Sequence, residues 1–317
     1  MKSLLVSLLA LILTASAEEP NAATAGLLES HTILTVYGRG FSTTPILGML
    51  GTFQDFDELA KGTAETVREI AAVNGGKPVV TGVDLIYAMA VPCQKKGDCL
   101  LYLDGGTLDL IETYIKPAAQ RGAIVILDTQ LGRSDPVAQV RRMIEKGYLK
   151  FENVHVAIDP EFHLLPKRRV PGTPIGTVTA QQVNEVQKLL DEYVVSEHLR
   201  TKKILIVHQF GDAAVHDGVP YMIRDKKTLA TYPNVQLAID ADGLGTPVMK
   251  VTKYNLMTNS ETYPSVRFRG IKIFYRCPLE KYGHFDKPPM TMKQVFDAAP
   301  VPGGPHMAAK PDVVIIA

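Results

Sequence analysis

Residues 153–159 read NVHVAID, a short apolar run that stops at an acid. Four further runs have the same form: AIVILD ends at Asp128, KILIVH at His208, NVQLAID at Asp240 and, less cleanly, PVVTGVD at Asp84. This pattern is typical of a buried parallel strand that delivers a reactive side chain to the carboxyl edge of a sheet. Because such edges are shared by all the strands, the five polar ends predict one cleft, and an enzyme is the leading interpretation.

Strand and helix patterns alternate along the rest of the chain. The predicted strands are His31–Tyr37, Pro78–Tyr87, Ala123–Asp128, Val154–Asp159, Lys203–His208, Val235–Asp240, Val266–Phe274 and Asp312–Ile316. The predicted helices are Phe56–Val73, Thr107–Gln120, Pro136–Lys146, Ala180–His198, a weak one near Lys226, an uncertain one over Thr246–Thr258 and a short one over Met292–Ala298. Eight strands, with a helix after each of the first seven, predict an α/β protein with a single (β/α)8 barrel whose last strand lies at the C-terminus.

The competing arrangement is an open, doubly wound sheet. In the run over 154–159, alternate side chains form an apolar face and a small or polar face. The apolar face has Val154, Val156 and Ile158, and the other has His155, Ala157 and Asp159. This contrast favours a barrel lumen, since both faces of an open sheet covered by helices are apolar. The segment GRGF also lacks the third glycine of a dinucleotide-binding fingerprint.

The composition and the N-terminal sequence limit the class of protein. With 34 basic and 33 acidic residues in 317, no broad charge field attracts nucleic acid. Residues 1–17 combine Lys2, an apolar stretch and Ala15-Ser16-Ala17, which predicts a cleaved signal peptide and a secreted or periplasmic protein. No later run is long and apolar enough for stable membrane insertion. The expected organisation is a signal peptide over 1–17, a flexible N-terminus over 18–30 and the barrel over 31–317.

The chain has three cysteines, Cys93, Cys99 and Cys277. An exported protein can hold a disulfide, and Cys93 has two candidate partners. A Cys93–Cys99 bond would close a short polar loop, whereas a Cys93–Cys277 bond would join two loops on the same face. The sequence leaves both pairings open.

The segment Asp159-Pro160-Glu161-Phe162-His163 is the strongest catalytic candidate. If the extended backbone continues, Asp159, Glu161 and His163 all face the cleft, because side chains two apart in a strand point the same way. A neighbouring ionised Asp would raise the pKa of Glu161 and make it a general acid near neutral pH.

This D-x-E at the end of the predicted fourth strand resembles that of secreted barrel glycoside hydrolases, notably the family 25 lysozymes and the chitinase-like families. The resemblance implies that Glu161 is the general acid and that Asp159 assists it. It covers three residues and the barrel context. The chitinase-like pattern has acids where this strand has His155 and Ala157, and the lysozymes have an acid on the first strand, where this chain offers Tyr37 and Arg39. These departures leave the exact family open.

Other strand ends supply the remaining candidates. The candidate catalytic residues are Glu161, Asp159, Asp128, Asp240 and His208. Asp128 or Asp240 would be the second carboxylate. The candidate substrate-binding residues are Tyr37, Arg39, Gln130, His163, Gln209, Asp242 and Lys272.

Three hypotheses on function follow. The first is a secreted glycoside hydrolase without a cofactor, acting on a carbohydrate or another small polar substrate. The second is a metal-dependent hydrolase or isomerase, in which Asp128, Asp159, Glu161, His208 and Asp240 supply oxygen and nitrogen ligands to a divalent ion. The third is an exported binding protein that uses the same cleft without catalysis.

Overall fold

Eight parallel strands close into a barrel in the described part of the chain. The computed structural model describes residues 26–43, 48–93, 97–164, 168–173, 175–211, 222–276 and 284–317. The barrel strands are β1 (Thr32–Gly38), β2 (Val79–Ala90), β4 (Ile124–Thr129), β5 (Val154–Ile158), β7 (Lys203–Gln209), β9 (Val235–Ala241), β10 (Phe268–Ile273) and β11 (Val313–Ile316). The pairing of β1 with both β2 and β11 closes the ring, so the predicted (β/α)8 barrel is confirmed.

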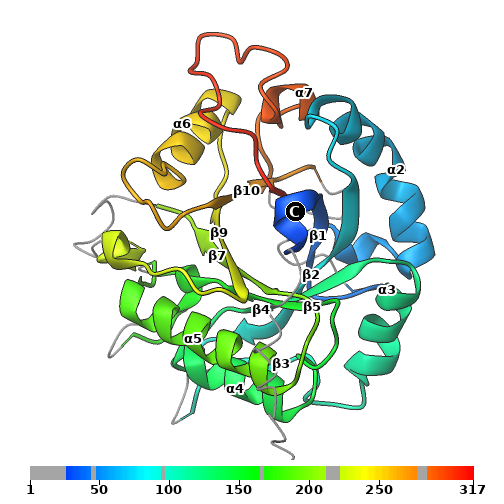
Figure 1. The fold of residues 1–317 in the computed structure, drawn as a ribbon, viewed down its shortest axis with the longest axis vertical. Helices are drawn as coiled ribbons and strands as arrows, with labels where there is room; N and C mark the ends of the chain where they lie inside the picture. The colour runs from blue at the N-terminus through cyan, green and yellow to red at the C-terminus, as the bar shows by residue number, and fades with distance from the viewer. Residues whose placement is uncertain are drawn as a thin grey trace, which may run out of the picture.

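Helices surround this ring, as the view along the barrel in Figure 1 shows. They are α2 (Phe56–Val73), α3 (Lys116–Gln120), α4 (Pro136–Glu145), α5 (Ala180–Ser196), α6 (Pro247–Met257) and α7 (Met292–Val295). The predicted helix over 107–120 is split into a π-helical turn, η2 (Ile111–Ile115), and α3, and the weak helix near residue 226 is the 3-10 turn η4 (Lys226–Thr228). Further 3-10 turns are η1 (Leu50–Thr52) and η3 (Pro160–Phe162).

Side-chain parity sorts the strands as the alternation predicts. On β5, Val156 and Ile158 pack in the apolar layer between the sheet and the helices, whereas Ala157 packs inside the barrel. The interior layer also contains Ile33, Ile126 and Ile206 from other strands, together with residues near the strand starts. The lower part of the lumen is therefore largely apolar, with the buried Gln236 side chain at its N-terminal end, whereas the acidic side chains, His208 and Lys272 lie in the upper part.

Local capping signals fix several helix starts. The Asp135 side chain accepts a hydrogen bond from Val137 N at 2.8 Å, directly before the predicted first-turn proline of α4. Thr179 and Gln182 form a capping box at the start of α5. Both were expected from sequence, because a side-chain oxygen at this position satisfies an otherwise unpaired N–H group.

A short helix, α1 (Leu27–Ser30), lies across the N-terminal end of the barrel in Figure 1. Leu28 is fully buried among the interior residues, and its N–H donates to the Gln236 side chain at 3.1 Å. Residues 27–30 therefore belong to the ordered domain, which corrects the expectation of a flexible segment up to residue 30. The predicted signal peptide over 1–17 lies outside the described residues. The polar ends of the strands lie at the other, carboxyl end of the barrel.

The chain after β2 turns back on itself. The short strand β3 (Leu100–Tyr102) pairs with β2 antiparallel, and a disulfide joins Cys93 to Cys99 between them. This is one of the two predicted pairings; Cys277 lies outside the described residues. Two further two-residue strands, β6 (Val178–Thr179) and β8 (Ile223–Arg224), form a separate small sheet.

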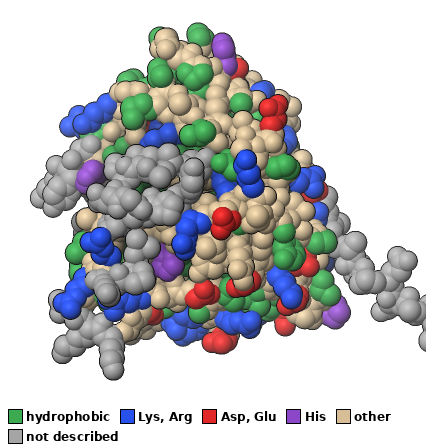
Figure 2. Space-filling model, turned by 90° about the vertical axis from the view of Figure 1, so that its left-hand side faces the viewer, with side chains coloured by type: hydrophobic (Ala, Val, Ile, Leu, Met, Phe, Trp, Pro, Cys, Tyr) green, Lys and Arg blue, Asp and Glu red, His purple; other side chains and the backbone are tan. Residues whose placement is uncertain are grey.

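Two further features are the distribution of surface charge and the character of the helices. Figure 2 shows basic and acidic side chains mixed over the face that it presents. In the described part of the chain, none of the helices has both the length and the apolar character needed to cross a bilayer.

The packing predicts a clear contrast between two leucine substitutions. Leu127 on β4 is fully buried in the layer under the helices, whereas Leu256 on α6 is 55% exposed. Leu127→Ala should lower the free energy of unfolding by about 2–5 kcal/mol through lost burial and a residual cavity. Leu256→Ala should change it by less than about 0.5 kcal/mol. Urea unfolding of both variants measures the difference, and equal effects would contradict the burial of Leu127 beneath the helices.

Candidate functional site

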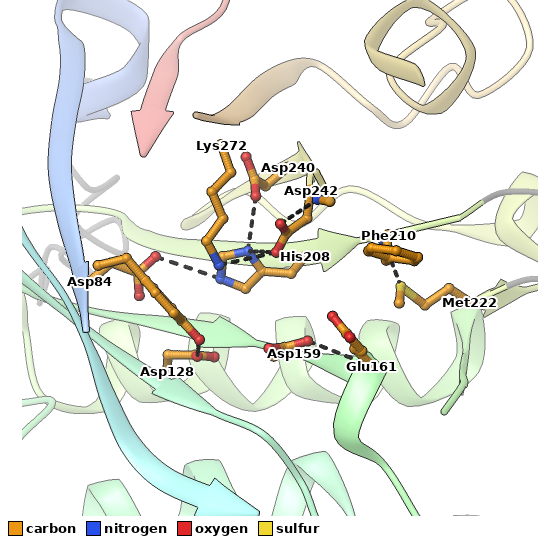
Figure 3. Close-up of polar contacts among 12 residues, drawn as sticks. Asp84, Asp128, Asp159, Glu161, His208, Phe210, Met222, Asp240, Asp242 and Lys272 are labelled. Atoms are coloured by element: carbon orange, nitrogen blue, oxygen red, sulfur yellow. Dashed lines mark hydrogen bonds and ion pairs between the residues drawn. The ribbon is translucent and has the colours of Figure 1, made fainter. Parts of the chain in front are cut away.

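Polar side chains from seven of the barrel strands meet at the carboxyl end of the lumen (Figure 3). They are Tyr37, Asp84, Asp128, Asp159, His208, Asp240, Asp242 and Lys272, and none of them is more than 5% exposed. Parity explains the gathering, since each belongs to the inward-facing set of its own strand or follows it directly. The structure thus brings four predicted catalytic residues, Asp128, Asp159, His208 and Asp240, into one place.

His208 occupies the middle of this group. Its Nδ1 lies 2.9 Å from Asp240 Oδ2 and 3.6 Å from Asp242 Oδ2, while its Nε2 lies 3.6 Å from Asp84 Oδ2. The register of β7 against β9 places His208 directly beside Asp240. Burial and Lys272 lower the pKa of His208, but the contacts with Asp240 and Asp84 outweigh them and raise it well above its usual value. This shift favours the imidazolium form of His208 between these acids.

A glycine makes room for one of these acids. Gly270 on β10 lies opposite Asp240, and a Cβ atom at this position would come within 2.9 Å of Asp240 Oδ1. A larger residue at position 270 would displace the carboxyl group that contacts His208.

Lys272 supplies the second cation. Its Nζ donates to Asp242 Oδ2 at 3.1 Å and lies 3.4 Å from the centre of the Tyr37 ring. Although burial raises the pKa of Asp242, the charges of Lys272 and His208 lower it to about 2. The Tyr37 hydroxyl in turn donates to Asp128 Oδ2 at 3.1 Å. Contacts therefore run from Asp242 through Lys272 and Tyr37 to Asp128.

The backbone after Asp159 does not stay extended, which corrects the sequence-based expectation. Residues 160–162 form the turn η3, and Asp159 caps it by accepting a hydrogen bond from Glu161 N at 3.2 Å. Pro160 suits the first position of this turn, because its missing N–H would be unpaired there. The turn keeps Asp159 and Glu161 adjacent by a different geometry from the one expected, and it carries His163 out of the alternation.

Glu161 lies at the rim of the site and is only partly exposed. Burial, together with the negative charges of Asp159 and Asp242, raises the pKa of Glu161 to about 8. Burial and Asp128 raise the pKa of Asp159 to about 7. At neutral pH, Glu161 therefore keeps its proton beside acids that are partly or fully ionised.

Two predicted binding residues have other roles. His163 Nδ1 lies 2.6 Å from Thr177 O, a loop contact. Arg39 uses its guanidinium group to bind backbone carbonyls of the β2–β3 region, those of Ile86, Tyr87 and Leu101. Arg39 therefore holds the β2–β3 loop in place, and its charge is not directed at the lumen.

Two predicted glutamines are also held by the protein itself. Gln130 Oε1 accepts from Ala90 N at 3.0 Å. Gln209 follows His208 and so has the opposite parity; its Oε1 accepts from Lys226 Nζ at 2.7 Å. Neither amide group is a main component of the lumen cluster.

Two components of the site were not among the predicted site residues. Asp84 was noted as a strand end, but its run is interrupted by Thr81 and Gly82, which weakened the signal. Phe210 lies at the rim on the side of Glu161 in Figure 3, and nothing in its local sequence distinguishes it from a core aromatic.

Charge balance limits the states that this site can adopt. With Glu161, the cluster has six carboxyl groups among the described residues; its own cations are His208 and Lys272, and Lys250 and Lys253 also act on Asp242. The carboxyl groups still outnumber these cations, which favours protonation of some of them or the binding of a further cation. Burial raises the pKa values of Asp128, to about 6, and of Asp240 in agreement with this tendency. The arrangement is therefore suited to hold a proton donor close to an ionised carboxylate.

Comparison of the sequence with protein-family models finds no match, and a search of curated proteins finds no significant relative. The interpretation of the site therefore depends on its own geometry.

The raised pKa of Glu161 predicts a pH-dependent effect of Glu161→Gln on stability. In the unfolded chain this carboxyl loses its proton near its ordinary pKa of 4.5, but in the folded protein it keeps the proton up to about pH 8. The wild type should therefore lose stability as pH rises between these values, and the variant should not show this loss. Because Glu161 is partly exposed, we expect the variant to gain roughly 1–3 kcal/mol relative to the wild type between pH 5 and pH 8.

Urea unfolding at a series of pH values measures this difference. Glu185→Gln, at an exposed position on α5, is the matched control and should show no such trend. A constant difference between Glu161→Gln and the wild type would show that the Glu161 carboxyl is ionised in the folded protein.

Proposed function

We propose that this protein is a glycoside hydrolase in which Glu161 is the general acid. The observation that carries the proposal is the position of Glu161: its carboxyl group lies mostly buried at the rim of a barrel lumen, beside Asp159 and in the electrostatic range of Asp242. Hydrolysis of a glycosidic bond needs a protonated carboxyl group to protonate the leaving oxygen and an ionised carboxylate on the opposite side of the sugar. The site offers both kinds of group at one end of the lumen.

A contact or a charge supports each role. Asp159 accepts the hydrogen bond from Glu161 N and so fixes the turn that presents the acid. Asp242 is the candidate for the second carboxylate, because its ion pair with Lys272 at 3.1 Å favours its ionised form. His208 Nδ1 lies 3.6 Å from Asp242 Oδ2 and is itself held by Asp240 at 2.9 Å. Asp240 and Asp128, the second carboxylates favoured from sequence, are fully buried.

The rim supports a carbohydrate as the substrate class. The Phe210 ring lies on the same side of the site as Glu161, and Lys253 Nζ lies 4.7 Å from the centre of that ring. An aromatic ring beside charged and polar groups suits a sugar, which has an apolar C–H face and polar edges. This ring replaces the tryptophan that the sequence lacks entirely.

The proposed location is outside the cytoplasm. The Cys93–Cys99 disulfide fits an oxidising compartment, where such bonds persist. The signal-peptide pattern over 1–17 supports the same proposal from sequence.

Aryl glycosides with different leaving groups test the role of Glu161. Glu161→Gln should reduce hydrolysis of natural glycans and of alkyl glycosides by roughly 10²–10⁴-fold, since it removes the proton donor. Glycosides of acidic phenols need little protonation to leave, so the variant should keep most of its activity on them. Wild-type activity on alkyl glycosides should fall as pH rises through about 8, where Glu161 loses its proton.

The control and the contrary result use the same assay. Asp242→Asn should lose activity on every substrate regardless of leaving group, and the exposed Glu185→Gln should retain all of it. Screening the wild type on a panel of aryl glycosides identifies the sugar before the variants are compared. An equal loss on all leaving groups in Glu161→Gln would exclude general-acid catalysis by this residue, and no hydrolysis of any glycoside by the wild type would remove the proposal.

A further inference from the structure

We infer that Asp84, Asp128 and His208 form a binding site for a first-row divalent metal ion, of the Mn²⁺ or Zn²⁺ class, at the floor of the lumen. The site lies beneath Glu161 and goes beyond the proposed hydrolysis, since none of its three ligands is assigned to protonate or attack the substrate. The ligand set also differs from the one expected from sequence, which included Asp159 and Glu161 and omitted Asp84.

The first observation is the convergence of three ligand atoms. Asp84, Asp128 and His208 each offer one ligand atom, and these three atoms lie within 4.8 Å of one another. His208 Nε2 and Asp84 Oδ2 are 3.6 Å apart, which exceeds the usual length of a hydrogen bond. Two ligands bound at about 2.1 Å to one ion, at angles of about 90–120°, are roughly 3.0–3.6 Å apart. The spacing therefore suits a shared ion.

The second observation is that the converging atoms have no hydrogen-bond partner. Both carboxylate oxygens of Asp84, Oδ1 of Asp128 and Nε2 of His208 are buried without one in the described structure. The three side chains are no more than 1% exposed. Buried polar atoms without partners are costly, and a bound ion is one of the few groups that satisfies several at once.

The third observation is that two of the ligands are each held by a neighbour, through the polar atom that does not face the proposed ion. His208 Nδ1 is hydrogen-bonded to Asp240 Oδ2 at 2.9 Å, and Asp128 Oδ2 accepts from the Tyr37 hydroxyl at 3.1 Å. A carboxylate on one imidazole nitrogen is the usual outer support of a metal-binding histidine, because it fixes the ring and leaves the other nitrogen for the metal. Asp240 and Tyr37 thus orient the free atoms of His208 and Asp128 toward Asp84.

A second group, His208, Asp240 and Asp242, is equally compact, but two of its converging atoms already have hydrogen-bond partners and only Asp240 Oδ1 is without one among the described residues. Its histidine atom, Nδ1, bonds to Asp240, and Asp242 Oδ2 accepts from Lys272 Nζ. An ion there would have to replace Lys272, whereas an ion between Asp84 and Asp128 displaces only the Nε2 proton of His208.

The donor set decides the class of ion. Two carboxylates balance a charge of 2+, and the imidazole nitrogen favours a transition metal over Mg²⁺ or Ca²⁺, which prefer oxygen ligands. Three protein ligands leave coordination positions for water, as in open metal sites.

Binding to the whole protein, after treatment with a chelator and its removal, tests the inference by calorimetry with Zn²⁺ and Mn²⁺. We expect one ion per chain in the wild type and little competition from equimolar Mg²⁺ or Ca²⁺. Asp84→Asn should weaken binding at least 100-fold, and the supporting change Asp240→Asn should weaken it about 10–100-fold. Circular dichroism and thermal unfolding check that each variant folds.

Glu161→Gln separates this inference from the proposed function. It should bind the ion as the wild type does while losing activity, so each proposal can fail alone. X-ray absorption of the Zn²⁺ form should show one imidazole nitrogen among oxygen ligands, even if a ligand variant does not fold. The absence of stoichiometric binding, undiminished binding in a folded Asp84→Asn variant, or a zinc spectrum without an imidazole would each overturn the inference. His208 would then be only an imidazolium paired with Asp84 and Asp240.

Discussion

The buried imidazole of His208 is the contact on which the site depends. It lies between Asp240 at 2.9 Å and Asp84 at 3.6 Å, with no more than 1% of its surface exposed. Acids that approach one another in a lumen without water repel strongly, and each loses its hydration. His208 and Lys272 are the cations within this cluster, and Lys250 and Lys253 also act on Asp242. The six carboxyl groups still outnumber these cations, which favours protonated carboxyl groups or an added metal ion.

This constraint divides the lumen into two levels. At the floor, Asp84, Asp128 and His208 are buried and point atoms without a hydrogen-bond partner toward one another. At the rim, Glu161 is partly exposed, and burial together with the acids beside it raises its pKa. Asp242 and Lys272 lie between the levels and connect them through His208 and Tyr37. Because the charges of the two levels interact, a cation at the floor would favour ionisation of Glu161 at the rim. The two proposals are therefore coupled but distinct.

The barrel could be predicted because its strands carry their own evidence. Alternation in runs such as NVHVAID separates Val156 and Ile158, which face the helices, from Ala157 and Asp159, which face the lumen. Elements without such alternation were missed. The helix α1 is four residues long, and β3 depends on a hairpin closed by Cys93 and Cys99. The turn after Asp159 was also missed. The prediction from side-chain alternation assumed an extended backbone, whereas the Asp159 carboxyl group accepts a hydrogen bond from Glu161 N and so favours a turn.

Residue identity at strand ends predicted which groups enter the lumen, but it could not predict their partners. Asp128, His208 and Asp240 were found because each ends an apolar run. The Tyr37 contacts with Asp128 and Lys272 depend on the closure of the barrel, which brings β1 close to strands distant in sequence. The Lys272 contact with Asp242 depends on the pairing of β10 with β9. Arg39 shows the opposite error, since a charged residue beside the lumen was expected to bind substrate and instead binds three backbone carbonyls.

The most direct test of the account is infrared difference spectroscopy of the metal-free protein at pH 7, comparing the wild type with Glu161→Gln. The account predicts that the carbonyl stretch of a protonated carboxylic acid is present in the wild type, is lost in the variant and titrates near pH 8. A spectrum in which the substitution removes only a carboxylate band would show that Glu161 is ionised, and the site would then lack its proton donor.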